Sequence, residues 1–398
     1  MKKSRMFLAS LIALGLIATG CGSADSHAAA QPSASPQSPQ SPESPQSCTT
    51  AVFDRMTEAE RVGQLFLVGI PVTGGPGQQA ESAIRDHHLG SVVFGGDSTQ
   101  GVGAIKDITS QVQDLTSATA GVKFFVAANQ EGGEIQPLKG PGFETMPTAL
   151  AQGAMSASAL QQAAYTWGRE LKQAGVNLNL APVMDVVPPG TAAGNAPIGA
   201  LDREFGDNPR INGEHGAAFI RGMREAGVVT SAKHFPGLGQ VRGNTDFTTN
   251  VVDNQTTADD PYLQSFQAAI DAGVPVVMVA LATYTRIDPD HLAVFSSRII
   301  QGILRDRMHF SGVVISDDLG EAAAVANIEP GTRAIDFITA GGDMITAQTV
   351  PAAVAMDEAV LRHATADAAF GQLVSTAVMR ILGVKESDGL LPCLPDVQ

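Results

Sequence analysis

Charged and amide side chains follow several short apolar segments of this chain, each at the point where the apolar run ends. They are Asn129, Gln130 and Glu131 after one run, Asp185 after the next, Asp202, Arg203 and Asp207 in the long segment beyond it, Lys233 and His234 after another run, and Asp317 and Asp318 after a later one. If the runs are parallel strands of a barrel, these groups gather at one rim, where such barrels carry their chemistry. Cations and carboxylates together can bind the hydroxyl groups of a ligand through hydrogen bonds. A further carboxylate can attack or stabilise an oxocarbenium-like carbon. The set therefore suits a polyhydroxylated ligand, although any one residue taken singly could be a helix cap or a rim salt bridge.

The elements that must position these residues alternate between apolar runs and amphipathic segments. The candidate strands are 64–70, 91–96, 123–129, 177–183, 228–234, 275–281, 312–318 and 343–347. Segments such as 157–175 and 261–273 lie between them, and several end in Ala-Gly directly before a strand, which is typical of a left-handed helix cap. The strands are apolar on both faces, as in a parallel sheet. Eight such units over about 350 residues predict a single-domain (β/α)8 TIM barrel of the α/β class.

A doubly wound open sheet is the competing fold, but no glycine-rich phosphate fingerprint follows the first strand. The formal net charge of −15 argues against a nucleic-acid partner, because nucleic-acid binding needs a clustered basic surface. The sequence contains no His-x-x-His or His-Glu-x-x-His spacing, and no Walker lysine-threonine pair. We therefore expect no metal site and no cofactor.

Six motifs occur in order and at barrel spacing, namely "MTEAERVGQLFLVG", "NQEGG", "NLNLAPVMDV", "DREFGDNP", "AKHFPG" and "VVISDDL". Together they resemble glycoside hydrolase family 3, in particular its single-domain bacterial β-N-acetylhexosaminidase branch. The resemblance covers nearly all of residues 48–384. The combination of "KHFPG" with a downstream "SDDL" is specific, whereas "EGG" alone is a weak signal.

The resemblance implies roles for individual residues. Asp317 matches the aspartate nucleophile of a retaining mechanism. Lys233, His234 and Arg203 match sugar-binding residues, and Asp202 is expected to orient Arg203 through a charge-assisted hydrogen bond.

The resemblance also implies a carbohydrate substrate of the N-acetylglucosaminide kind, including peptidoglycan fragments. Asn129 stands where the family has an aspartate before its "EGG" motif, and we expect it among the substrate-binding residues. Glu134 replaces the usual arginine after that motif. Both changes are expected to alter the sugar pocket. A β-glucoside or another glycan is therefore an alternative substrate.

The chain departs from the family pattern most strongly in the segment after the fifth candidate strand. The Asp-Ser-His triplet whose histidine serves as acid/base in this branch aligns with Asn244-Thr245-Asp246, and no histidine exists between His234 and His291. The family's common histidine after "FPG" and its aspartate partner are Leu238 and Gln240 here, and the histidine that commonly ends the sixth strand aligns with Leu281.

Asp246 is the titratable residue at the position of the missing histidine. A carboxylic acid can transfer the proton if burial or a neighbouring carboxylate raises its pKa. We therefore expect a glycoside hydrolase with Asp317 as nucleophile and Asp246 as acid/base. A sugar-binding protein without turnover and a scaffold role are the alternatives.

The N-terminal segment has the pattern of an export signal. Lys2, Lys3 and Arg5 precede the apolar run 6–17, and Ala18-Thr19-Gly20 leads directly to Cys21. This resembles a bacterial lipobox, although the usual leucine is Ala18. It predicts a signal peptide over residues 1–20 and a lipid on Cys21 that holds the protein at the outer face of the cell membrane. An ordinary signal peptide with a chance cysteine is the alternative.

The segment 21–47 is rich in Ser, Pro, Gln and Ala and predicts a disordered tether before a barrel domain at residues 48–398. Cys48 and Cys393 bracket that domain almost completely. Because disulfides persist where exported proteins fold, we expect the two cysteines to pair. Two free thiols are the alternative.

Overall fold

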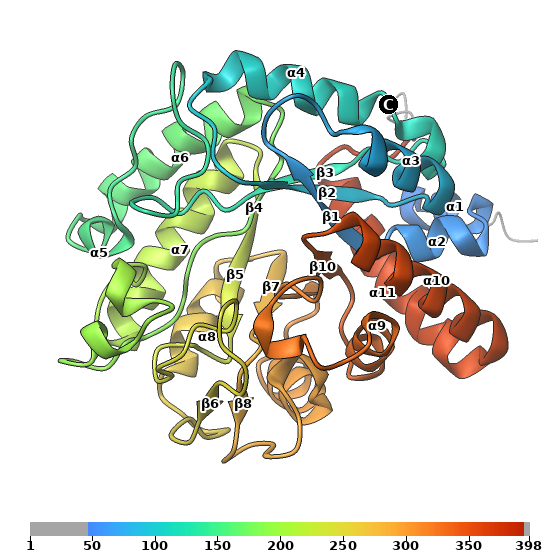
Figure 1. Cartoon of the computed structure of the whole chain (residues 1–398). Coiled ribbons are helices and arrows are strands. Elements are labelled where there is room, and N and C mark those ends of the chain that lie inside the picture. The colour runs from blue at the N-terminus through green and yellow to red at the C-terminus, as the bar shows by residue number, and fades with distance from the viewer. Residues whose placement is uncertain (1–46, 394–398) are drawn as a thin grey trace, which may run out of the picture. The chain divides into compact units, whose positions relative to one another are not determined.

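The apolar runs form one parallel sheet in the computed structural model, which describes residues 47–393. Its strands are β1 (Phe66–Pro71), β2 (Ser91–Gly95), β3 (Phe125–Ala128), β4 (Leu178–Asn179), β5 (Val229–Phe235), β7 (Val276–Val279), β9 (Val313–Ser316) and β10 (Ile345–Ala347). They neighbour one another in the order β10-β1-β2-β3-β4-β5-β7-β9. A parallel bridge between Ile315 and Met344 brings the two ends of the sheet together. The predicted (β/α)8 barrel is confirmed (Figure 1).

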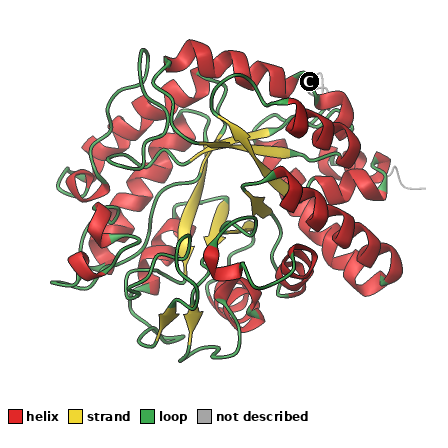
Figure 2. Ribbon diagram, in the orientation of Figure 1, coloured by secondary structure: helices red, strands yellow, loops and turns green. Residues whose placement is uncertain are grey.

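Helices follow the strands and surround the sheet, as the ribbon in Figure 2 shows. They are α1 (Cys48–Arg55), α2 (Glu58–Gly63), α3 (Gln78–His87), α4 (Gly101–Gln113), α5 (Ala149–Gln152), α6 (Ala157–Gln173), α7 (Pro209–Glu225), α8 (Leu263–Asp271), α9 (Pro330–Thr339), α10 (Val350–Ala366) and α11 (Ala368–Ser387). Helices α6, α7 and α8 each lead into a strand through an Ala-Gly pair. The glycines Gly175, Gly227 and Gly273 have φ values of 78°, 77° and 79°, the left-handed conformation expected at a helix cap.

The strands are buried on both faces, because helices cover the outside and side chains fill the inside. Val92 and Val93 are consecutive residues of β2, so their side chains point to opposite faces, and neither exposes any surface. This double burial explains why the strands are continuous apolar runs rather than alternating ones.

The fourth strand is shorter than predicted, since its regular ladders with β3 and β5 span only Leu178 and Asn179. Two asparagine side chains add hydrogen bonds between this strand and the backbone in and beside β3. The Asn177 amide pairs with the backbone of Val126 and Phe124, and the Asn179 amide pairs with both backbone groups of Gln130. These amides replace ladder hydrogen bonds and fix the start of the loop after β3, which carries site residues.

A pair of short strands and a π-helix were not predicted from the sequence. A small parallel pair, β6 (Val252–Asp253) and β8 (Thr283–Tyr284), joins the loops that follow β5 and β7. A π-helix, Arg298–Arg307, takes the place of the barrel helix between β7 and β9.

A disulfide joins Cys48, the first residue of α1, to Cys393, and confirms the predicted pairing. The Cα atoms are 6.0 Å apart, and α1 packs against α11. The two ends of the barrel are thereby covalently joined. The predicted signal peptide, Cys21 and nearly all of the tether lie outside the described residues.

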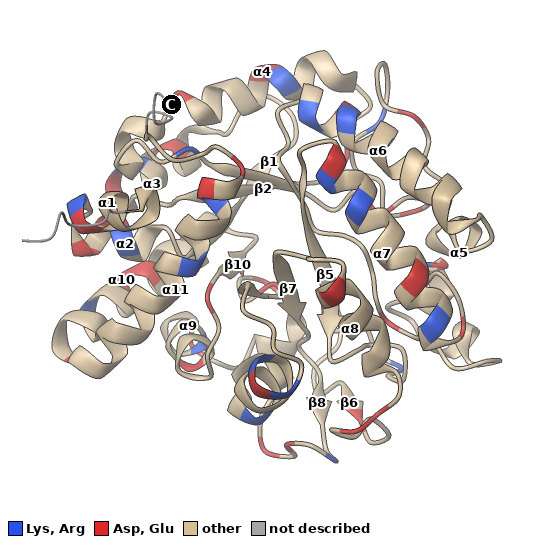
Figure 3. Cartoon of the chain, turned by 180° about the vertical axis from the view of Figure 1, so that it is seen from behind, with Lys and Arg blue, Asp and Glu red and all other residues tan. Residues whose placement is uncertain are grey.

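Among residues 47–393, no helix is both long and apolar enough to cross a membrane. Acidic and basic residues are interspersed on outer helices such as α6 and α7, as Figure 3 shows from behind.

Lys385 of α11 is a fully buried lysine at a distance from the polar rim. Its Nζ donates to Gln64 Oε1 and to the Gly90 carbonyl, both at 2.8 Å, and lies 5.3 Å from the centroid of the Phe125 ring. Both hydrogen-bond acceptors are uncharged. Burial therefore lowers the pKa of Lys385 to about 7.

The lowered pKa of Lys385 predicts a stability that rises with pH. Between about pH 7 and the ordinary lysine pKa of 10.5, the unfolded chain holds a proton that the folded chain has lost. Each pKa unit corresponds to about 1.4 kcal/mol. We expect the free energy of unfolding, measured by denaturant titration, to rise from pH 7 to pH 9.5 more steeply in the wild type than in Lys385→Met. Equal slopes in the two proteins would contradict the account.

Candidate active site

A cavity of about 690 Å³ opens at the carboxyl ends of the strands. Of the predicted site residues, Asn129, Arg203, Lys233, His234, Asp246 and Asp317 line it. They come from the loops after β3, β4, β5 and β9 and from β5 itself. The fold thus brings together residues that are far apart in the sequence, at the rim where a barrel carries its chemistry.

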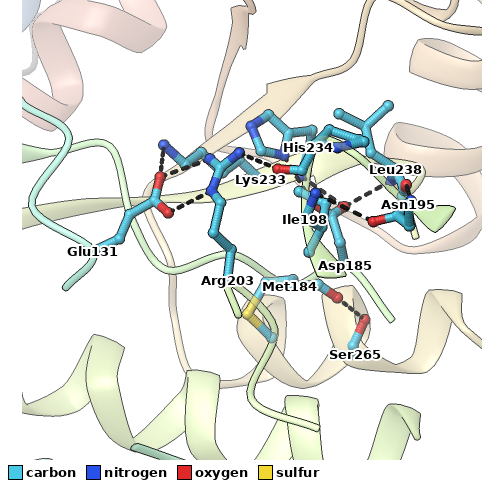
Figure 4. Close-up of polar contacts among 12 residues, drawn as sticks. Glu131, Met184, Asp185, Asn195, Ile198, Arg203, Lys233, His234, Leu238 and Ser265 are labelled. Carbon is cyan, nitrogen blue, oxygen red and sulfur yellow. Dashed lines mark hydrogen bonds and ion pairs between the residues drawn. The ribbon is translucent and has the colours of Figure 1, made fainter. Parts of the chain in front are cut away.

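Glu131 forms the centre of a buried ion cluster in this cavity (Figure 4). Its carboxylate accepts two hydrogen bonds of 2.8 Å from Arg203, one from Nε and one from Nη2. Lys233 Nζ lies 2.6 Å from Glu131 Oε1 and donates to Asn129 Oδ1 at 2.7 Å. Burial opposes ionisation of Glu131, but the two cations outweigh burial and lower its pKa to about 2.

The prediction that Asp202 orients Arg203 is therefore wrong, because the carboxylate that binds Arg203 is that of Glu131. Asp202 is exposed, has a φ of 53° at the end of a turn, and is not among the residues that line the cavity. This left-handed turn separates the directions of neighbouring side chains, so that Arg203 points inward and meets Glu131 instead. Glu134, expected to alter the sugar pocket, is also exposed and outside the cavity, whereas Asn129 lines it.

Glu131 is the residue that sequence reasoning missed. The sequence pattern places it at the rim but indicates no role for it. The signal that could have identified it is electrostatic, because Arg203 and Lys233 at the same rim need a buried carboxylate between them.

Lys233 and His234 both line the cavity although they are consecutive residues of a strand, whose side chains would ordinarily alternate. The register of β5 against β7 shifts between Ala232 and Phe235, which interrupts the alternation. Lys233 instead pairs with the segment after β4, through a bridge to Val183.

Asp185 fixes the orientation of His234 and of the turn after it. His234 Nδ1 lies 2.8 Å from Asp185 Oδ2, and the backbone N–H groups of His234 and Leu238 donate to Asp185 Oδ1 at 3.1 and 2.9 Å. Asp185 exposes no surface. Because Nδ1 is occupied, Nε2 is the ring nitrogen of His234 that remains for a ligand.

The two aspartates at the end of β9 have different surroundings. Asp318 accepts hydrogen bonds from the backbone N–H groups of Gly320, Glu321 and Gln348, at 2.8, 3.0 and 2.9 Å. The Asp317 carboxylate lines the cavity and accepts one hydrogen bond, from the Asp318 N–H at 2.9 Å. Asp318 thus organises the loop, and Asp317 keeps lone pairs for a ligand.

The segment with the missing histidine lies against the loop after β9. Its backbone accepts hydrogen bonds at Thr245 and Asp246, both of 3.1 Å, from the N–H groups of Ala324 and Ala323. The Asp246 N–H donates to Asn244 Oδ1 at 2.9 Å, and Thr245 is buried. These contacts hold Asp246 at the cavity, which Asp317 also lines.

Asp246 keeps an exposed edge at the mouth of the cavity. The loss of surrounding water and, next, the negative charge of Asp317 raise its pKa above the ordinary value, although His234, Arg203 and Lys233 oppose the shift. Asp246 and Asp317, two of the five carboxyl groups that line the cavity, therefore differ in their surroundings. Such a pair can divide the roles of proton donor and anionic group between its members.

Sequence and structure comparisons identify the family of this chain. Residues 57–384 match the model of the glycosyl hydrolase family 3 N-terminal domain. A beta-hexosaminidase of Stenotrophomonas maltophilia is 33% identical over 63% of this chain and 76% of its own length. The crystal structure of a beta-N-acetylhexosaminidase from Beutenbergia cavernae is 46% identical, covers 83% of this chain and 99% of its own, and superposes with a TM-score of 0.80. A family 3 beta-N-acetylglucosaminidase from Paenibacillus is 26% identical with a TM-score of 0.76, over 86% of this chain and 65% of its own. The chain therefore belongs to glycosyl hydrolase family 3, and it is an O-glycosyl hydrolase.

Proposed function

We propose that this protein is an exported, membrane-tethered β-N-acetylhexosaminidase that works by a retaining mechanism, with Asp317 as nucleophile and Asp246 as acid/base. The observation that carries the proposal is the pair of carboxyl groups in one cavity, of which Asp246 has a raised pKa. Asp317 occupies the position of the family nucleophile and has one hydrogen bond to its carboxylate.

In the first step, an oxygen of the Asp317 carboxylate bonds to the anomeric carbon of the sugar. The glycosidic bond breaks, and its oxygen takes the proton of the Asp246 carboxylic acid. In the second step, a water molecule attacks the anomeric carbon of the glycosyl-enzyme. The water gives one proton to the Asp246 carboxylate, and the ester bond to Asp317 breaks. Asp246 returns to its protonated form at the end of each cycle.

A raised pKa suits the part that Asp246 has in these steps, because the acid must hold its proton at the working pH. The substrate itself would strengthen this shift by excluding water from the cavity mouth, where Asp246 is now exposed. An aspartic acid needs no charged partner of the kind that a catalytic imidazole uses, which is consistent with Asn244 two residues before it.

The ion cluster is suited to holding sugar hydroxyl groups. Lys233 uses two of its three N–H donors on Glu131 and Asn129, and keeps one. Arg203 uses three of its five donors, two on Glu131 and one on the Pro197 carbonyl. The names of the relatives support an N-acetylhexosaminide as substrate, and a cell-envelope location would bring peptidoglycan fragments within reach.

The nucleophile role predicts that Asp317→Ala abolishes turnover of every aryl glycoside that the wild type cleaves. We expect kcat/KM to fall roughly 10⁴-fold or more, as for removal of a catalytic nucleophile elsewhere. Circular dichroism should show an intact barrel. Asp202→Ala is the matched control, because this exposed carboxylate lies outside the cavity, and it should retain activity within about twofold. Equal losses in the two variants would contradict the assignment.

The acid/base role predicts a loss in Asp246→Ala that depends on the leaving group. Dinitrophenyl glycosides need little protonation and should lose little in the first step, whereas poor leaving groups should lose roughly 10²–10⁴-fold in kcat/KM. Because the pKa of Asp246 is raised, the wild type should stay active above the ordinary aspartate range and lose activity as Asp246 deprotonates. This alkaline limb should disappear in the variant. Added azide should partly restore its turnover. A loss independent of the leaving group would remove Asp246 from the mechanism, and a wild type that binds glycans but cleaves no aryl glycoside from pH 4 to 8 would overturn the enzyme proposal.

The proposed tether depends on one residue, Cys21, which lies outside the described part of the chain. We expect Cys21→Ser to move the protein from the membrane fraction to the soluble fraction, because the anchor is the lipid on that cysteine. Fractionation followed by immunoblotting measures this. A variant that stays with the membrane after its signal peptide is removed would contradict lipid anchoring.

A further inference from the structure

Phe247 is the most exposed of the large hydrophobic side chains in the described part of the chain. It exposes 83% of its surface, against 48% for Val252 and 42% for Leu150. A single exposed apolar residue needs no special explanation by itself. Phe247 is unusual in its position, because it follows Asp246 directly and lines the same cavity.

The backbone around Phe247 is held in place. Its N–H donates to the Asn244 carbonyl at 3.2 Å, and the two preceding residues are hydrogen-bonded to the segment after β9. Thr245 is buried below it. The ring is therefore presented to solvent on a fixed turn rather than packed into the core.

The position of Asp246 defines where the leaving group of a substrate must be. A general acid has to reach the glycosidic oxygen, so the leaving group lies against Asp246 once the cleaved sugar is bound over Asp317. The next side chain along this wall is Phe247. An aromatic ring offers a flat apolar face with negative potential, which suits the C–H groups on one face of a pyranose ring.

There is room for a longer glycan beyond this point. Gly243 and Thr248, which flank the segment Asn244–Phe247, line a second cavity of about 910 Å³. Arg242 and Asn250 also line it. A chain that passes over Phe247 would continue toward polar groups that can bind further hydroxyls.

From these observations we propose that Phe247 is the platform on which the leaving-group sugar stacks, and that it selects substrates with a pyranose ring beyond the cleaved bond. This inference rests on the proposed function, because it uses Asp246 as the acid that marks the leaving-group side. It assigns to Phe247 a role in specificity, with no part in proton transfer or bond making.

The test compares two sugars on a protein that cannot cleave them. In the Asp317→Asn background, calorimetry measures the affinity for N-acetylglucosamine and for its β-1,4-linked disaccharide. The ratio of the two affinities reports the contribution of the second ring. We expect Phe247→Ala to lower this ratio roughly three- to tenfold, the range of aromatic packing contributions, and Phe247→Trp to keep it. Leu150→Ala, which removes another exposed apolar side chain, is the control and should leave the ratio as it is.

A ratio that is the same in Phe247→Ala and in its parent would overturn the proposal, as would an equal drop in the Leu150→Ala control. A drop in Phe247→Ala that Phe247→Trp does not restore would also count against it, because any flat ring should serve as platform. The outcome is separate from that of the proposed function. A wild type without glycosidase activity would refute the mechanism, while the binding ratio would still decide the role of Phe247.

Discussion

The buried ion cluster of Glu131, Arg203 and Lys233 is the interaction on which the site depends. Its three members come from the loops after β3 and β4 and from β5, so it holds three neighbouring parts of the rim together. Burying charges is expensive, and removing one partner of a buried pair typically costs about 3–5 kcal/mol. The cluster is favourable here because each oxygen of Glu131 meets a cation at hydrogen-bond distance. Its two cations exceed the charge of Glu131 by one, and Asp185 and Asp317 lie close enough to Arg203 to balance the excess.

Of the carboxylates that line the cavity, this arrangement leaves Asp317, Asp246 and the exposed Glu321 outside the ion cluster and the loop hydrogen bonds. Glu131 is occupied by cations, Asp185 by His234 and two backbone N–H groups, and Asp318 by three backbone N–H groups. Asp317 and Asp246 have few hydrogen bonds to their carboxylates and line the cavity. We propose that Asp246, a carboxyl group with a raised pKa at the position of the family histidine, supplies the proton in its place.

The barrel could be predicted from the sequence because each of its parts has a local signal. Doubly buried strands are apolar throughout, and helices before strands end in Ala-Gly. The site residues at the strand ends followed from the same pattern. The disulfide was predicted on other grounds, because Cys48 and Cys393 bracket the domain of a chain with an export-signal pattern. What could not be predicted depends on the directions of side chains at irregular backbone. Asp202 and Arg203 are neighbours in the chain, but a left-handed residue turns one outward and the other toward Glu131.

The shortening of β4 and the β6–β8 pair were missed for a related reason. Asn177 and Asn179 interrupt an apolar run. Their side-chain amides hydrogen-bond to the backbone of the neighbouring strand and its loop, and no hydrophobic periodicity indicates such bonds. The β6–β8 pair joins loops that meet only after the barrel has closed. Such tertiary contacts override local propensity.

Trapping the glycosyl-enzyme intermediate would show whether Asp317 bonds covalently to the sugar while Asp246 supplies the proton. In Asp246→Ala, a dinitrophenyl N-acetyl-β-glucosaminide should still react with Asp317, whereas the second step lacks its base. Mass spectrometry of the variant after incubation should therefore find one N-acetylhexosaminyl group per chain, on the proteolytic peptide that contains Asp317. Release of dinitrophenol without an adduct, or an adduct on another residue, would contradict the account.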